Sequence, residues 1–168
     1  MSITNTEGYF VKYTSLVTEN NLTEAFANQD RILNEFSEKI SEEKSLYAYE
    51  VGKWTLRELL QHVIDTERIF AYRALAIARK DTSILPSFDE NLYAANANGN
   101  ARTWQSLVAE MKAVRETTKI LFNSFTKDML TTDGKFSSNN ANPETLGFII
   151  IGHLYHHIKI VAERYIVD

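Results

Sequence analysis

The sequence predicts an all-α fold, a four-helix bundle with a long crossover between its second and third helices. The chain has 168 residues, of which 44% are hydrophobic, and this suits a single domain, 1–168, with a sizeable core. Only six glycines and two prolines interrupt it, and no segment sustains the alternating pattern of a strand. Four segments repeat apolar residues at helical spacing, and a bundle buries the apolar faces of all four.

Residues 1–20 are aromatic but too short to fold alone, so we expect an N-terminal arm that packs on other elements. The first bundle helix is predicted over 22–40. Its apolar side comprises Leu22, Ala25, Phe26, Gln29, Ile32, Leu33, Phe36 and Ile40. A connector over 41–52 follows it.

The second helix is predicted over 56–79. Thr55 and Glu58 form the T-x-x-E pattern of a capping box, which marks its start. Glu67 falls in the same sector as the apolar residues, and His62 lies at the margin of that sector. The position of His62 by itself does not indicate a metal ligand.

Residues 80–102 show little periodicity and form a long connection, which is typical of a functional loop or a crossover. Extended, they span roughly 70 Å, enough to return along a helix of about 35 Å. The third helix, capped by Thr103, is therefore expected to run parallel to the second. A polar loop over 126–142 precedes a fourth helix that begins at Pro143.

The fourth helix carries three of the four histidines within the sequence GFIIIGHLYHHIKIVAER, residues 147–164. The residues predicted to form one inward-facing seam are Leu146, Ile150, His153, His157, Ile160 and Arg164. Imidazoles at i and i+4 can converge on one metal ion. The alternative is that both are hydrogen-bonded core histidines. A reactive metal site usually has three protein ligands, and His62 is the only histidine outside this helix.

Charge and composition exclude several classes of function. The net charge is −4 and the pI is about 5.6, without a basic cluster, so nucleic-acid binding is disfavoured. The chain has no cysteine, so any metal must be bound by nitrogen and oxygen. No signal peptide and no apolar run of membrane-spanning length are recognised, and a soluble cytoplasmic protein without a membrane partner is expected.

Three segments resemble the DinB-like superfamily, also described as DinB/YfiT-like metalloenzymes. They are GKWTLRELLQHVIDTERIFAYRAL at 52–75, LPSFDENLY at 85–93 and GHLYHHIKIVAERY at 152–165. The resemblance implies a four-helix bundle in up-down-down-up order. It also implies a divalent metal ion bound by His62, His153 and His157. His156 falls on a mixed surface of the helix, and we leave it outside the site.

Three neutral imidazoles suit zinc, nickel or ferrous iron better than magnesium or calcium. Some members of the superfamily are transferases that use a low-molecular-weight thiol such as bacillithiol. The resemblance therefore implies a metal-dependent transferase that activates an external thiol for attack on a small-molecule electrophile. One alternative is a metal-dependent hydrolase, and another is a non-enzymatic metal-binding module of the stress response. A di-iron centre is excluded because no Glu precedes a histidine by three residues.

Catalytic residues beyond the metal ligands are not identified by the sequence. Asp65, Glu67 and Glu90 are the carboxylates available as a general base. Further residues resemble a pattern in one branch of the family, and we assign them structural roles: Arg68, Tyr72, Arg73, Phe88, Asp89 and Tyr93. The crossover is expected to cover the mouth of the pocket. Members of the superfamily are often dimers, so a homodimer is one expectation.

Overall fold

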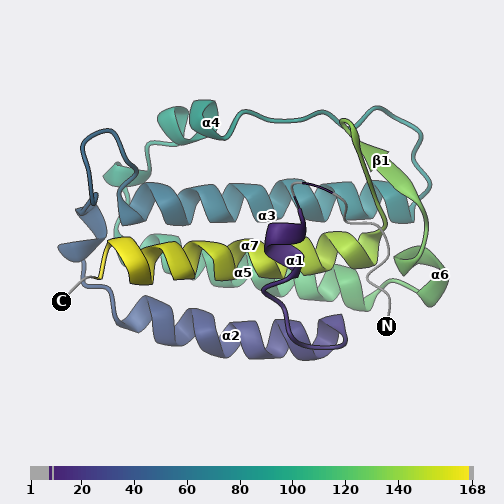
Figure 1. Ribbon diagram of the computed structural model, residues 1–168, viewed down its shortest axis with the longest axis horizontal. Helices are drawn as coiled ribbons and strands as arrows, with labels where there is room; N and C mark the ends of the chain where they lie inside the picture. Colours follow the sequence, from purple (N-terminus) through teal and green to yellow (C-terminus); the bar gives the residue numbers. More distant parts are fainter. Residues whose placement is uncertain (1–7, 9, 167–168) are drawn as a thin grey trace.

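The computed structural model describes residue 8 and residues 10–166. Its four long helices are α2 (Leu22–Glu38), α3 (Leu56–Ala78), α5 (Trp104–Asn123) and α7 (Pro143–Arg164). Figure 1 shows that α2 and α7 run in one direction along the bundle, whereas α3 and α5 run in the other. The four-helix bundle, its up-down-down-up order and the long crossover are thus confirmed.

The predicted caps set the starts of the helices. In α3, the Thr55 hydroxyl accepts from the amide of Glu58 at 3.2 Å, and the amide of Thr55 donates to the Glu58 carboxylate at 2.8 Å. Thr103 accepts from the amide of Ser106 at the start of α5, at 3.1 Å. The predicted helix ends also agree with the structure within two residues. The first two bundle helices were predicted to end at residues 40 and 79, and α2 ends at Glu38 and α3 at Ala78.

The crossover contains two short elements, α4 (Glu90–Asn96) and η2 (Gly99–Ala101). Its end is fixed to the start of α3, because the Arg57 guanidinium donates to the carbonyls of Asn100 at 3.1 Å and Arg102 at 2.6 Å. The chain therefore enters α5 beside the first turn of α3. Since α3 and α5 start at the same end of the bundle and extend to the other, they run parallel (Figure 1).

The expectation of a plain loop over 126–142 is wrong, because this segment contains α6 (Lys127–Leu130) and a small hairpin. Strand β1 (Gly134–Phe136) pairs antiparallel with β2 (Asn139–Ala141), with Gly134 opposite Ala141. Strands this short show no periodicity in the sequence. The buried ring of Phe136 lies 5.8 Å from that of Phe70, and the amide of Ser137 donates to the carbonyl of Leu85 at 2.8 Å. These contacts hold the hairpin against α3 and the crossover.

The described part of the N-terminal arm packs on α7 through α1 (Val11–Thr14). Tyr13 and Val17 are buried there, whereas Tyr9 lies outside the described residues. The remaining short element, η1 (Lys44–Leu46), lies in the connector between α2 and α3. The arm thus covers part of the same chain.

Helix α7 is the core helix of the bundle. By length and composition it could cross a membrane, so the sequence-based expectation that no segment is long and apolar enough is wrong. Within the protein, however, 67% of its most apolar stretch is buried. A core helix has the same length and composition as a membrane span, and here α7 is surrounded by α1, α2 and α3.

Candidate metal centre

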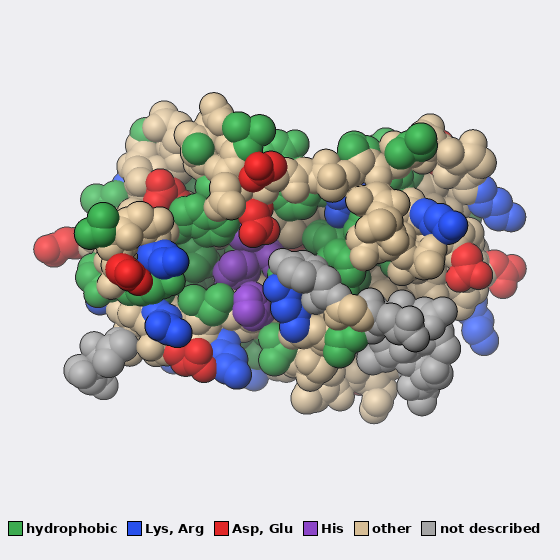
Figure 2. Space-filling view, turned by 45° about the horizontal axis from the view of Figure 1, so that its top comes forward, with side chains coloured by type: hydrophobic (Ala, Val, Ile, Leu, Met, Phe, Trp, Pro, Cys, Tyr) green, Lys and Arg blue, Asp and Glu red, His purple; other side chains and the backbone are tan. Residues whose placement is uncertain are grey.

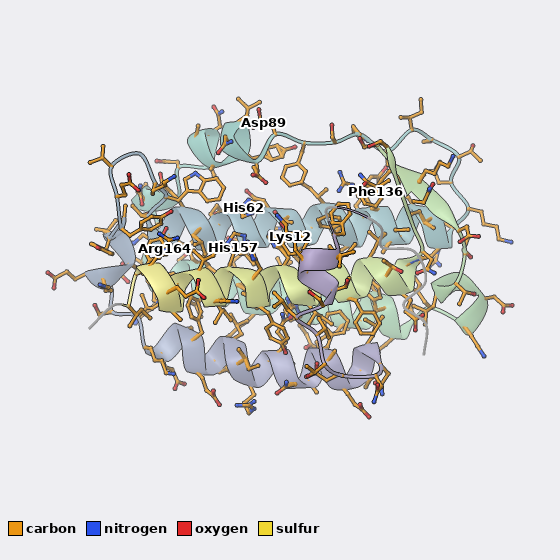
Figure 3. The ribbon with its side chains drawn as sticks, in the orientation of Figure 1. Lys12, His62, Asp89, Phe136, His157 and Arg164 are labelled. Atoms are coloured by element: carbon orange, nitrogen blue, oxygen red, sulfur yellow. The ribbon has the colours of Figure 1, made fainter. Side chains whose placement is uncertain are left out.

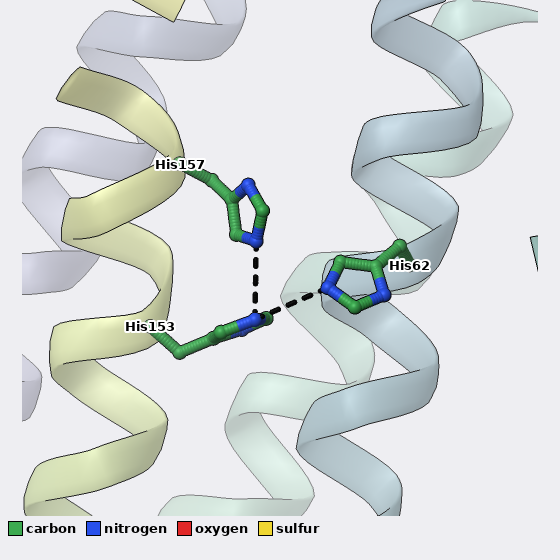
Figure 4. Close-up of side chains that lie close together, drawn as sticks. All are labelled: His62, His153 and His157. Carbon is green, nitrogen blue, oxygen red and sulfur yellow. Dashed lines mark hydrogen bonds between the residues drawn. The ribbon is translucent and has the colours of Figure 1, made fainter. Parts of the chain in front are cut away.

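Three histidines converge between α3 and α7. His62 extends from α3, and His153 and His157 extend from consecutive turns of α7 (Figure 4). All three are buried, with 5–8% of each residue exposed. The Nε2 atom of His153 lies 3.2 Å from Nε2 of His62 and 3.1 Å from Nε2 of His157. The structure therefore brings together the three histidines that the sequence analysis singled out.

Hydrogen bonds among the three rings cannot satisfy all of the facing Nε2 atoms. His153 Nε2 carries either one hydrogen or one lone pair, yet it faces two other ring nitrogens at hydrogen-bonding distance. One of the two contacts is therefore incomplete in every combination of neutral tautomers. A cation in contact with all three lone pairs removes this conflict.

The environment keeps the three rings neutral. Burial lowers the pKa of His62 to about 4. Burial also holds the pKa of His153 and of His157 well below the usual value, and the neighbouring imidazoles lower both further. A neutral imidazole has the free lone pair that metal binding requires, so the site is prepared for a cation near neutral pH.

The spacing of the nitrogens fits a small divalent ion. In a tetrahedral site, zinc–nitrogen bonds of about 2.0–2.1 Å place the nitrogens about 3.4 Å apart. The two short nitrogen–nitrogen distances are 3.1 and 3.2 Å, and all three ligand atoms lie within 4.8 Å of one another. A donor set of three nitrogens is typical of zinc, nickel and ferrous iron.

Aromatic rings hold the outer sides of the histidines. The ring of Trp54 lies 4.9 Å from that of His62, and the ring of Tyr13 lies 5.2 Å from that of His153. Among the described residues, Nδ1 of His157 has no hydrogen-bond partner. Packing therefore fixes the orientation of His62 and His153.

The other four positions of the predicted seam differ in burial. Leu146 and Ile150 are buried like the two histidines, and Ile160 is half-buried. Arg164, expected to face inward, is exposed, and its guanidinium lies 6.0 Å from the ring of Tyr49. It occupies the last turn of α7, where a cation interacts favourably with the helix dipole. His156 lies outside the cluster, half-buried, with its ring 5.4 Å from that of Tyr13.

A cavity of about 240 Å³ adjoins two of the histidines, His62 and His153. Figure 2 shows histidine side chains within a hollow near the centre of one face, and Figure 3 shows His62 and His157 in mid-bundle below the crossover that carries Asp89. The crossover contributes to the wall, as the sequence analysis expected. The described residues that line the cavity are Phe10, Tyr13, His62, Thr66, Phe70, Arg73, Ser87, Phe88, Glu90, Phe136, Ser137, Asn139 and His153.

The three carboxylates considered as general bases have different surroundings. Glu67 forms a buried ion pair with Arg115, with a shortest distance of 2.6 Å. Asp65 accepts a hydrogen bond from Gln61 at 3.0 Å, and burial raises its pKa. Of the three, only Glu90 is among the described residues that line the cavity, and it is exposed.

Thr66 and Arg73 line the cavity but were not recognised as site residues. Both lie on the face of α3 that carries His62, so extending that face from His62 in steps of three and four residues would have found them. Phe136 and Asn139 belong to the short hairpin, which has no sequence signature. Their place in the wall could not have been inferred.

Comparisons with known proteins agree with this architecture. A family model described as the DinB superfamily matches residues 25–161. The solved structure of YfiT from Bacillus subtilis, described as a probable metal-dependent hydrolase with an unusual four-helix bundle topology, superposes with a TM-score of 0.67. The identity is 16%, and the match covers 97% of this chain and 89% of YfiT. None of the curated proteins compared with the chain matches it significantly.

Proposed function

Because the chain belongs to the DinB superfamily, we propose that it is a metal-dependent enzyme whose divalent ion is bound by His62, His153 and His157. The observation that carries the proposal is the convergence of three neutral imidazoles beside a cavity of about 240 Å³. A metal with a purely structural role is usually enclosed by four protein ligands. Three ligands with a cavity next to them favour an ion that meets a substrate.

The ion would be zinc, nickel or ferrous iron, and it would supply Lewis acidity that makes a coordinated thiol or water molecule a better nucleophile near neutral pH. The chain itself contributes three fixed, neutral ligands. Its aromatic side chains, Tyr13, Phe70 and Phe136, shield the reacting groups from bulk water.

The reaction that we propose is transfer of a low-molecular-weight thiol to an electrophilic small molecule. The chain has no cysteine, so the thiol must come from a cosubstrate. The aromatic wall of the cavity suits an electrophile with an apolar carbon skeleton. The proposal places the protein in the cytoplasm, where small thiols are kept reduced.

A hydrolase is the second candidate. Its support is the description of YfiT as a probable metal-dependent hydrolase, together with Glu90, a carboxylate in the cavity wall that could accept a proton from water. A third reading is a stress-response module whose ion has no catalytic role. The cavity beside the histidines favours the two enzymes over this module.

The thiol-transfer proposal predicts that conjugation depends on His153. Purified protein loaded with zinc or nickel is mixed with bacillithiol or glutathione and a chromogenic aryl halide. We expect the unmodified protein to catalyse conjugation. For His153→Ala, the conjugation rate should fall to that of the reaction without protein. The matched control is His156→Ala, which changes a neighbouring histidine outside the cluster and should conjugate at the original rate.

Thiol conjugation that persists unchanged in His153→Ala would remove the metal from the mechanism. If ester or amide hydrolysis without thiol depends on His153 and conjugation does not, the hydrolase is correct and the transferase is wrong.

A further inference from the structure

Arg73 of α3 is a buried cation with few polar partners. Only 4% of the residue is exposed. Its Nη2 atom donates to the carbonyl of Pro86 at 2.7 Å, and its guanidinium carbon lies 4.5 Å from the ring centre of Phe136 and 4.9 Å from that of Phe70. No carboxylate among the described residues forms an ion pair with it. Most of its five N–H donors are therefore available to a ligand.

The other buried arginines are paired differently. Arg115 binds both carboxylate oxygens of Glu67, at 2.9 and 2.6 Å. Arg57 donates to the Glu42 carboxylate at 2.5 Å and to the carbonyls of Asn100 and Arg102. Elsewhere in the described structure, then, folding supplies a carboxylate to each buried guanidinium. Burial also lowers the pKa of Arg73, as expected for a cation without a counter-charge.

Arg73 lines the same cavity as His62 and His153. Thr66 lies on the cavity wall between His62 and Arg73 along α3, is only 3% exposed, and its hydroxyl has no hydrogen-bond partner within the described residues. Glu90 is the one acidic side chain of the described wall, and it does not form an ion pair with Arg73. The cavity therefore offers unsatisfied donors and positive charge, which select an anion.

The positions along α3 indicate the shape of the ligand. His62 and Arg73 are about three turns apart, roughly 16 Å along the axis. A ligand that reaches both must be elongated, with its anionic group at the end away from the histidines. A planar guanidinium fork matches a carboxylate in bidentate geometry.

We propose that Arg73 is the binding site for the carboxylate of an elongated organic acid, whose other end reaches His62 and His153. Thr66, one turn from His62, offers its hydroxyl to the middle of the same ligand. The role of the ligand's contact with His62 and His153 rests on the proposed function, whereas binding of its carboxylate at Arg73 does not. The substrate class is thus a small carboxylic acid with an apolar segment that packs against the cavity wall formed by Phe70 and Phe136.

The test measures binding of hexanoate, 1-hexanol and hexylphosphonate, which are short ligands that probe the Arg73 end of the site alone, by calorimetry and without an activity assay. Chelator-treated protein is used alongside metal-loaded protein, so that binding at the ion is separated from binding at Arg73. We expect chelator-treated protein to bind hexanoate at least about tenfold more tightly than 1-hexanol, because a charge-assisted hydrogen bond contributes that much or more. Arg73→Met should lose this preference, and Arg73→Lys should keep part of it.

Two further measurements test binding at Arg73 without relying on Arg73→Met. If Arg73→Met does not fold, the Nε–H signals of ¹⁵N-arginine in the unmodified protein serve instead, and hexanoate should shift one of them. His153→Ala should still bind hexanoate, which distinguishes failure of the metal site from failure of the Arg73 site. The proposal is overturned if hexanoate does not bind, if it binds Arg73→Met as tightly, or if hexylphosphonate is preferred over hexanoate.

Discussion

Replacing Arg115 with Met is expected to lower the free energy of unfolding by about 3–5 kcal/mol, because it leaves a buried carboxylate without its counter-charge. Arg115 is 1% exposed and Glu67 is 3% exposed. Arg115 also donates to the side-chain carbonyl of Gln29, whose amide donates to the carbonyl of Ile151 at 2.5 Å. The network connects α5, α3, α2 and α7, so its loss affects all four bundle helices.

The matched control is the double variant Glu67→Met and Arg115→Met. It removes both charges and fills similar volume, so it should recover at least half of the stability lost in the single variant. Denaturant unfolding is followed by circular dichroism in the presence of a chelator, because metal binding would add its own stabilisation. If the free energy of unfolding of Arg115→Met lies within about 1 kcal/mol of that of the original protein, a structural role for the ion pair is contradicted.

Gly152→Ala is expected to displace α1 from α7. A Cβ atom at Gly152 would lie 2.0 Å from the carbonyl oxygen of Tyr13, and because the obstacle is backbone, no side-chain rotation relieves it. Overpacking of this kind lowers the free energy of unfolding by about 1–3 kcal/mol. Tyr13 packs against His153, so displacement of the arm is also expected to expose one side of the three-histidine cluster.

Amide hydrogen exchange measures this effect directly. Residues 10–17 should exchange faster in Gly152→Ala, whereas the first turns of α3 should be unchanged. Gly147→Ala is the matched control in the same helix, because the atoms nearest to its Cβ would belong to the side chains of Leu22 and Phe122 and not to backbone. Unchanged exchange of residues 10–17 in Gly152→Ala would show that the arm does not depend on this close approach.

The helices and their starts could be predicted because the determining interactions are local. The capping pair of Thr55 and Glu58 lies within one turn, and the apolar periodicity of α2 and α5 is a property of each segment alone. The convergence of His62 with His153 joins two distant segments. Its prediction rested on the count of histidines and on the family resemblance.

The partners of other residues could not be predicted, because they depend on how the helices are rotated in the bundle. Glu67 was recognised in the apolar sector of α3, but its partner Arg115 lies on α5 and follows from the packing of those helices. The hairpin of β1 and β2 is too short for a periodic signal. The cavity wall assembles from the arm, the crossover and this hairpin, so Arg73 acquires its significance only in the folded chain.

The central claim is that His62, His153 and His157 bind one divalent ion, and metal content tests it most directly. Protein purified without a histidine tag is analysed for zinc, nickel and iron, alongside His62→Ala, His157→Ala and the control His156→Ala. We expect about one ion per chain in the original protein and in the control, and at most about one tenth of that in the other two variants. Undiminished metal content in both His62→Ala and His157→Ala would contradict the claim.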